Sequence, residues 1–289
     1  MHPRIIARLD IKGPNLVKGV HLEGLRVLGR PEDFARYYYE TGADELLYQD
    51  IVASLYGRNS LHDVISKTAR GVFIPLAVGG GLRSVEDIRS VLKAGADKVV
   101  LNTAAIKNPE FITAASRRFG SSTIVVAIEC IRQADGGYLA YTDNGREFTG
   151  RDAISWAVQA EELGAGELVV TSVDREGTGT GFDLTLTKLV TSKVSIPVIA
   201  HGGAGQLQDI RDVIVEGGAD AVAVASMLHY NAITTQYVSA DETLEGNRDF
   251  LKGRRTFQVV EARAMNEIKQ FLSTSGIACR NGVADRFAT

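Results

Sequence analysis

The amino-acid sequence predicts an α/β protein: a single (β/α)8 TIM barrel made of two related halves. Three observations predict this fold. Eight short runs rich in β-branched residues alternate with amphipathic stretches, a length of 289 residues is ordinary for one such barrel, and one sequence pattern recurs in both halves. Parallel strands need crossover helices between them, which accounts for the alternation. We therefore expect residues 1–289 to form one domain.

The expected strands are short and evenly distributed along the chain. They cover residues 4–10, 45–50, 75–78, 98–102, 123–129, 167–172, 197–200 and 221–225. The expected helices between them include 31–41, 85–94, 150–163 and 207–216. Gly-Ala pairs follow several of these helices, and glycine just past a helix end is the usual residue before the chain turns into the next strand.

An internal repeat supports the two-half architecture. Residues 41–46 resemble 163–168, and residues 80–89 resemble 202–211 at the same offset. Several matches at one offset and in one order indicate two related half-barrels. The alternation of strands and helices is interrupted after the last strand. There, a polar stretch of about residues 235–261 predicts an insertion in the last βα loop. A lid, a partner contact and a solvated excursion all fit that stretch.

The composition excludes several function classes. A formal net charge of −3 without a Lys/Arg-rich run argues against nucleic acid as a partner. Two cysteines, Cys130 and Cys279, and five histidines without metal-ligand spacing argue against a disulfide framework, a zinc site or any other metal site. No signal peptide or membrane-length apolar run is present, so we expect a cytoplasmic protein that needs no cofactor.

Small and hydroxyl residues follow strands at equivalent points of the two halves. They are Gly80, Gly81, Asn102 and Thr103 in the first half, and Gly202, Gly203, Ala225 and Ser226 in the second. Glycine lets backbone N–H groups approach an anion, and a following helix N-terminus adds a favourable dipole. Two such sites predict a ligand with a phosphate at each end. The alternative is that the glycines only form tight βα turns.

Carboxylates at strand ends form a second group. Asp10 ends the first expected strand and Glu129 the fifth, so they face each other across a barrel of eight. An acid and a base on opposite sides of a substrate suit ring closure and bond cleavage. Lys18, in the first βα loop, could steer a phosphate or stabilise an anion. For Asp174, after the sixth strand, a loop ion pair or helix cap is an equal alternative.

Four charged residues begin strands at the other end of the barrel: Arg4, Glu45, Lys98 and Glu167. Such a ring is costly to desolvate unless its members pair. It is either a stabilising ionic plug or a gate that admits a small molecule along the barrel axis, and composition leaves both open.

These motifs together resemble the cyclase subunit of imidazole glycerol phosphate synthase, a histidine-biosynthesis barrel. The likeness extends from about residue 4 to 230 and resumes from about 264 to 280. The motifs that carry it are Leu16-Val17-Lys18-Gly19, Val78-Gly79-Gly80-Gly81, Thr171-Ser172-Val173-Asp174-Arg175-Glu176-Gly177-Thr178 and Gly202-Gly203-Ala204-Gly205.

The resemblance implies a specific reaction. Members of this family take ammonia from a glutaminase subunit docked at the N-terminal barrel face. They react it with a bisphosphorylated ribulosyl ribotide to form imidazole glycerol phosphate and an aminoimidazole carboxamide ribotide. The resemblance assigns catalysis to Asp10, Glu129 and Lys18, and the ammonia gate to the four charged residues. It assigns the phosphate and substrate contacts to the small residues named above together with Asp174, Glu176, Gly177 and Thr178.

Several positions depart from the family pattern. The family usually has aspartate where this chain has Glu129 and Glu176, and a small residue where it has His201. An extra methylene can displace a carboxylate by about 1 Å, which can cost about 10²-fold in rate. The sequence favours the ammonia-dependent cyclase. The alternatives are a paralogous barrel that delivers ammonia to another acceptor, such as a surface sugar in amidine formation, and a non-catalytic phosphate-binding barrel.

Overall fold

The computed structural model confirms the (β/α)8 barrel. It describes residues 2–53, 61–235 and 260–280. Eight parallel strands follow one another around the barrel, and pairing between β7 and β10 closes it. These strands are β1 (Arg4–Lys12), β4 (Glu45–Asp50), β5 (Leu76–Gly79), β6 (Lys98–Leu101), β7 (Ile124–Arg132), β10 (Glu167–Ser172), β11 (Val198–His201) and β12 (Ala221–Val224).

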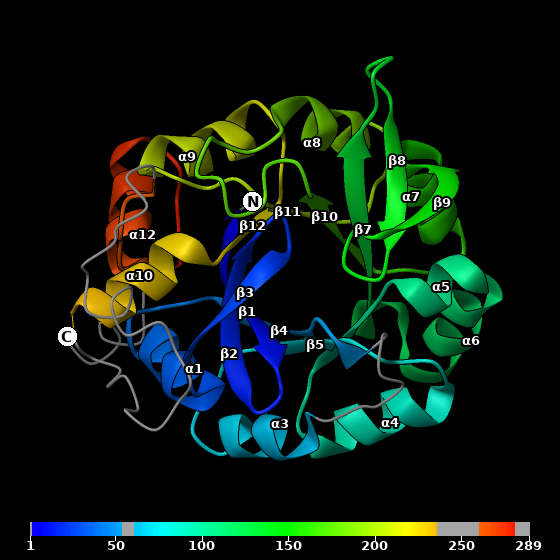
Figure 1. Cartoon of the computed structure of the whole chain (residues 1–289), viewed down its shortest axis with the longest axis horizontal. Coiled ribbons are helices and arrows are strands. Elements are labelled where there is room, and N and C mark those ends of the chain that lie inside the picture. The colour runs from blue at the N-terminus through cyan, green and yellow to red at the C-terminus, as the bar shows by residue number, and fades with distance from the viewer. Residues whose placement is uncertain (1, 54–60, 236–259, 281–289) are drawn as a thin grey trace.

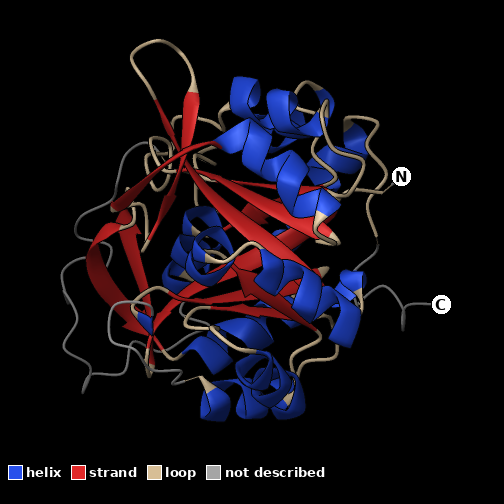
Figure 2. Ribbon diagram, turned by 90° about the vertical axis from the view of Figure 1, so that its right-hand side faces the viewer, coloured by secondary structure: helices blue, strands red, loops and turns tan. Residues whose placement is uncertain are grey.

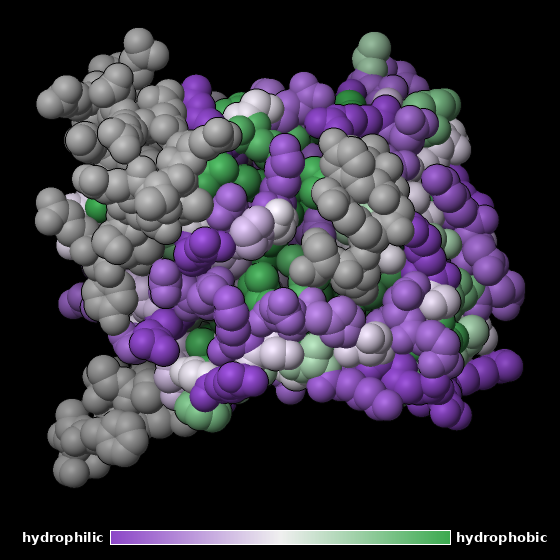
Figure 3. All heavy atoms as spheres, turned by 60° about the horizontal axis from the view of Figure 1, so that its bottom comes forward, coloured by the Kyte–Doolittle hydropathy of each residue, from purple (hydrophilic) through white to green (hydrophobic). Residues whose placement is uncertain are grey.

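Helices surround the strands on the outside of the barrel, as Figure 1 shows. They are α1 (Pro31–Glu40), α3 (His62–Ala69), α4 (Val85–Ala94), α5 (Thr103–Lys107), α6 (Glu110–Phe119), α7 (Ala153–Glu162), α8 (Leu184–Thr191), α9 (Leu207–Val215), α10 (Ser226–Thr234) and α12 (Met265–Thr274), with a short 3-10 helix at Ser121–Thr123. The face shown in Figure 3 is mostly hydrophilic, with scattered hydrophobic side chains. In the described part of the chain, no helix is long and apolar enough to cross a membrane.

The two halves repeat at the level of hydrogen bonds as well as sequence. Asp87 Oδ2 accepts from the backbone N–H of Ser84 at 2.9 Å, at the start of α4. Asp209 Oδ2 accepts from the N–H of Gln206 at 2.9 Å, at the start of α9. An acceptor of this kind satisfies a backbone donor that the first helical turn leaves without an intrahelical partner. The repeat therefore preserves the same helix start after β5 and after β11.

The strands place alternate residues on opposite faces of the barrel wall. Ile5, Ala7 and Leu9 of β1 pack outward in the large core between sheet and helices. Ile6 lies in a separate inner cluster with Leu47, Ala77, Val100, Val125, Val169, Ile199, Ala221 and Ala223. Because side chains alternate along a strand, residues 4, 8 and 10 share the inner face with Ile6. The barrel interior therefore has charged ends and an apolar middle.

Two strand pairs extend the barrel and were missed by the sequence analysis. β2 (Asn15–Val20) and β3 (Glu23–Gly29) form an antiparallel hairpin that pairs with β1, while β8 (Tyr138–Thr142) and β9 (Glu147–Asp152) extend β7. In Figure 2 the hairpins lie on the left, on the side opposite the N-terminus. This pairing explains why β1 and β7 continue past residues 10 and 129.

One predicted helix boundary was wrong. We expected a helix over 150–163, but α7 begins at Ala153. Asp152 caps it by accepting from the N–H of Ser155 at 2.7 Å, and residues 147–152 belong to β9. Most of the predicted insertion at 235–261 lies outside the described residues.

Candidate active site

The predicted acid–base pair lies at the C-terminal ends of opposite strands. Asp10 is on β1 and Glu129 on β7, four strands apart in the closed order of eight. Asp10 is 3% exposed and Glu129 8%. The structure therefore places both carboxyl groups at the rim of the barrel interior, and neither caps a helix.

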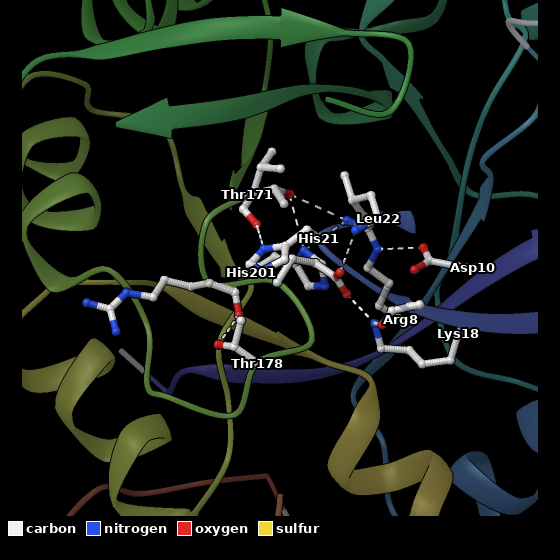
Figure 4. A network of polar contacts seen from close by, with 12 residues as sticks. Arg8, Asp10, Lys18, His21, Leu22, Thr171, Thr178 and His201 are labelled. Carbon is white, nitrogen blue, oxygen red and sulfur yellow. Dashed lines mark hydrogen bonds and ion pairs between the residues drawn. The ribbon is translucent and has the colours of Figure 1, made fainter. Parts of the chain in front are cut away.

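Arg8 is a buried cation beside this pair that the sequence analysis missed. Its Nε donates to Asp10 Oδ1 at 2.9 Å, and its Nη1 donates to His201 Nδ1 at 3.1 Å. Figure 4 shows Arg8 between Asp10 and His201, with Thr171 beside the imidazole. The signal was available in the sequence, because Arg8 lies two residues from Asp10 and strand side chains repeat every two residues.

Glu129 has a backbone amide as a hydrogen-bond donor. Its Oε2 accepts from the backbone N–H of Gly145 at 2.7 Å. Burial raises the pKa of Glu129 to about 7, against the lowering effects of the Gly145 N–H, the Arg8 charge and Asn102, while the Asp143 charge also raises it. A carboxyl group that titrates near neutrality can donate and accept protons at physiological pH.

His201 is a neutral hydrogen-bond acceptor at the end of β11. Burial, followed by the positive charges of Arg8 and Lys18, holds the pKa of His201 well below its usual value. Since arginine can only donate, the His201 Nδ1 that contacts Arg8 carries no proton. The Thr171 hydroxyl, 3.2 Å away, then donates to the same nitrogen. The imidazole proton is therefore on Nε2.

A cavity of about 700 Å³ opens on the first-half side of the rim. Gly80, Gly81, Asn102, Thr103 and Glu129 line it together. The Asn102 Oδ1 atom is buried and lacks a hydrogen-bond partner among the described residues. The structure thus brings the predicted first-half residues and Glu129 around one space, whose size is typical of a small-molecule site.

The second-half residues have a different setting. The lining of that cavity does not include Gly202, Gly203, Ala225 or Ser226. A Cβ atom added at Gly203 would overlap the carbonyl oxygen of Gly181, and one added at Gly202 would overlap the carbonyl oxygen of Ser172. Gly181 also donates to Gly203 O at 2.8 Å. These glycines therefore allow close packing of the loop after β10, whatever ligand the loop contacts.

The loop after β10 is fastened to the β2–β3 hairpin. Lys18 Nζ forms a buried ion pair with Glu176 Oε1, and Glu176 Oε2 accepts from the N–H of Leu22 at 2.8 Å. Gly177 packs against Gly19 of the same hairpin. Lys18 thus has a fixed anionic partner at the rim.

Asp174 and Thr178, in the same loop, each form a hydrogen bond with a nearby backbone group. Asp174 is exposed, and its Oδ2 accepts from the N–H of Arg132 at 2.8 Å. Thr178 donates to Arg175 O at 2.7 Å. Asp174 therefore has a hydrogen-bond donor at the end of β7, and its predicted substrate contact stays a prediction.

The four charged residues at the other end of the barrel form a closed ring. Arg4 contacts Glu45 at 2.6 Å and also Glu167. Lys98 contacts Glu45 at 3.0 Å and Glu167 at 2.9 Å. Burial raises the pKa of Glu45, and the charges of Lys98 and Arg4 oppose that rise. Each charge has two opposite neighbours, which offsets its desolvation.

Residues between β8 and β9 also border the cavity and were not predicted. Asp143 and Asn144 line it, and Gly145 supplies the donor to Glu129. Asp143 and Asn144 have φ of 52° and 65°, in the left-handed region that Asp and Asn adopt more readily than other side chains. An Asp-Asn-Gly turn was the available signal for this hairpin.

Comparisons with known proteins agree with this architecture. The family described as "Histidine biosynthesis protein" matches residues 4–234. Imidazole glycerol phosphate synthase subunit HisF of Legionella pneumophila is 59% identical over 206 residues, which cover 71% of this chain and 97% of that protein. The subunit HisF of Alkaliphilus metalliredigens (strain QYMF) is 49% identical over 231 residues, 80% of this chain and 92% of that protein. The chain therefore belongs to the histidine biosynthesis protein family and, within it, to the HisF cyclase subunits of imidazole glycerol phosphate synthase, which are lyases of histidine biosynthesis.

Proposed function

We propose that the C-terminal rim converts a bisphosphorylated ribulosyl ribotide and ammonia into imidazole glycerol phosphate and an aminoimidazole carboxamide ribotide. The observation that carries this proposal is the pair Asp10 and Glu129 on opposite strands of one rim. A substrate held between them meets a proton acceptor on one side and a proton donor on the other. Cleavage and ring closure both need such transfers.

The cavity supports one end of this substrate. Gly80 and Gly81 have no side chains, so a phosphate can approach their backbone N–H groups. Thr103 and the Asn102 amide add polar groups, so one phosphate would bind on this side. The second phosphate would bind near Gly202, Gly203 and Ser226, next to the loop that contains Gly177 and Thr178. Lys18 would stabilise negative charge that develops between the two ends, while Glu176 holds it in place.

The opposite end of the barrel suits a partner that delivers ammonia. The names of both relatives describe a subunit, so those proteins act within an assembly. We propose a glutaminase subunit at the N-terminal face, with ammonia entering past the ring of Arg4, Glu45, Lys98 and Glu167. Above the ring, the inner cluster that contains Ile6 and Val100 is apolar and suits a neutral molecule. A cytoplasmic location agrees with the two free cysteines.

Turnover with ammonium salt tests this function directly. The purified chain is given the ribotide and ammonium, and substrate loss is followed by ultraviolet absorbance with product identification. The expected result is imidazole glycerol phosphate from the wild type and at least about 10²-fold slower turnover from Asp10→Asn and from Glu129→Gln. Tight binding of the ribotide without turnover would contradict the proposal and favour delivery of ammonia to another acceptor. Unchanged turnover by Asp10→Asn would refute the acid–base assignment.

A further inference from the structure

Arg8 is a buried cation that pairs with Asp10 and lies on the path between the two proposed catalytic carboxylates. It extends from β1 into the barrel interior and is 4% exposed. A guanidinium stays charged at any working pH, so its burial requires an anionic partner. Asp10 is that partner, at 2.9 Å from Arg8 Nε. Arg8 Nη1 also lies 3.5 Å from Thr171 Oγ1, and Thr171 on β10 is paired in register with Glu129 on β7. The guanidinium is therefore close enough for its charge to lower the pKa of Glu129.

The two carboxylates are coupled to Arg8 in different ways. Asp10 accepts a charge-assisted hydrogen bond from it. Glu129 instead accepts from a neutral backbone N–H, that of Gly145. Within the described residues, no Lys, Arg or His nitrogen lies within ion-pair distance, 4.0 Å, of the Glu129 carboxyl group. The hydrogen bond at Asp10 therefore has a cationic donor, whereas the one at Glu129 has a neutral donor.

Arg8 is fixed from its other side by neutral groups. His201 Nδ1 accepts from Arg8 Nη1 at 3.1 Å, and Thr171 Oγ1 lies 3.5 Å from the same atom. Thr171 in turn contacts His201 at 3.2 Å. Because His201 and Thr171 are neutral, they orient the guanidinium without cancelling its charge. Figure 4 shows this chain of contacts leading to Asp10.

We propose that Arg8 is a positioning residue that keeps Asp10 as the base and leaves Glu129 as the acid, and that His201 and Thr171 act through it. The inference rests on the proposed function for these two roles. Asp10 takes one proton from the reacting groups and Glu129 gives one to them. Exchange with solvent then returns both to their starting states.

Several other charges face Glu129 and define the background for a test. Asp143 opposes Arg8, since its negative charge raises the pKa of Glu129. The Lys107 ammonium lies 3.9 Å from Asp143 Oδ2. Among the described residues, the remaining charged side chains around the same cavity are Asp50, Arg83 and Glu147. Removal of Arg8 takes away a charge that lowers the pKa of Glu129 and leaves Asp143, which raises it, so Glu129 should then hold its proton to higher pH.

The test is a titration of Glu129 that needs no substrate. The protein is labelled with ¹³C at glutamate carboxyl groups, and the Glu129 signal is identified by its loss in Glu129→Gln. We expect the Glu129 midpoint to rise by about 1 pH unit in Arg8→Met and to stay close to the wild-type midpoint in Arg8→Lys, which keeps the charge. An unchanged midpoint in Arg8→Met would overturn the inference. Lys269→Met is the matched control, because it removes a buried cation paired with Asp44 at 2.7 Å at the other end of the barrel.

Arg8→Met leaves Asp10 as a buried anion without its cation, which endangers folding. The double variant Arg8→Gln/Asp10→Asn removes both partners and serves as the second measurement. A smaller rise of the Glu129 midpoint is expected, because the negative charge of Asp10 is removed together with the positive charge of Arg8, and an unchanged midpoint overturns the inference here too.

The role of His201 is tested by its effect, through Arg8, on the titration of Glu129. His201→Phe removes the acceptor, and His201→Asn supplies an amide oxygen in its place. We expect His201→Phe to shift the Glu129 midpoint and to lower kcat about 10-fold with little change in KM, and His201→Asn to restore part of both. A wild-type midpoint in His201→Phe would remove His201 from the proposal.

Kinetics distinguish the two proposals. Glu129 acts as the acid, so kcat/KM should fall as pH rises through its midpoint, and this alkaline limb should move upward in Arg8→Met. A wild type that does not turn over the ribotide refutes the proposed function alone. An unshifted titration refutes the role of Arg8 alone.

Discussion

Lys18 on β2 and Glu176 after β10 form a buried ion pair, although 158 residues separate them in the chain. Glu176 also accepts from the N–H of Leu22, so a single side chain holds the β2–β3 hairpin against the loop after β10. This contact gives a physical use to the glutamate at a position where the family pattern has aspartate. One carboxylate oxygen of Glu176 contacts Lys18 and the other accepts from the Leu22 amide.

Loss of the Glu176 charge should destabilise the protein strongly. Glu176→Gln leaves Lys18 buried without its anionic partner, and such a change costs about 3 kcal/mol. Glu176→Asp keeps the charge but shortens the side chain, so a smaller loss is expected. Urea denaturation measures both. The control is Glu86→Gln, which breaks an exposed pair with Arg89 and should cost under about 0.5 kcal/mol. Equal losses in Glu176→Gln and the control would contradict the prediction.

Glu129 should make stability depend on pH below neutrality. Its folded pKa of about 7 lies above the ordinary value of 4.5, so the folded state binds the proton more tightly than the unfolded state. The contribution is complete below pH 4.5 and is lost as pH rises through about 7. Its size is about 3 kcal/mol. Denaturation of wild type and Glu129→Gln between pH 4 and 8 measures the difference, and parallel curves would contradict it.

His201 should remain neutral with its proton on Nε2. Burial and the nearby cations lower its pKa, and Nδ1 accepts from Arg8. Long-range ¹H–¹⁵N spectra at pH 6 should show an unprotonated Nδ1. An imidazolium signal there would refute the assigned tautomer. Because the unfolded histidine binds a proton more readily, stability should fall as pH drops below about 6.5.

Gly203→Ala should be costly for two reasons that can be separated. Its φ is 117°, and a methyl group would overlap Gly181 O. Gly136 has φ of 89° but nothing within 4 Å of an added methyl group. Gly136→Ala therefore reports the backbone cost alone, about 1 kcal/mol, and Gly203→Ala should lose clearly more in thermal denaturation. Similar losses would show that the loop after β10 yields to the methyl group.

Glu45→Gln should distinguish the two possible roles of the ionic ring, an ammonia gate and a stabilising plug. Glu45 contacts both Arg4 and Lys98, so its neutralisation leaves two cations with only Glu167. With a glutaminase present, a gate predicts that glutamine-dependent turnover falls more than ammonium-dependent turnover, by about 10-fold in their ratio. Equal falls in both, together with lower stability, would identify the ring as a plug without a gating role. Glu45→Asp is the matched variant, since it keeps the charge.

The amino-acid sequence by itself determined the barrel. Alternating β-branched runs and amphipathic helices, with glycine at helix ends, encode βα units. The parallel strands of such units form either a closed barrel or an open sheet, and the internal repeat favours the barrel. Periodicity also placed Arg4, Glu45, Lys98 and Glu167 at strand starts. Apart from the repeat, these features are local, since each depends on residues a few positions apart.

Only the tertiary structure decided which rim residues meet. The ion pair of Lys18 with Glu176 and the contact of Arg8 with His201 join residues more than 150 positions apart. The strand period alone places Arg8 on the same face as Asp10, but its contact with His201 exists only because the barrel brings β1 next to β12 and within reach of β11. Such contacts depend on burial and on the register between strands, because the same charge on an exposed loop would be solvated and would influence neither carboxylate.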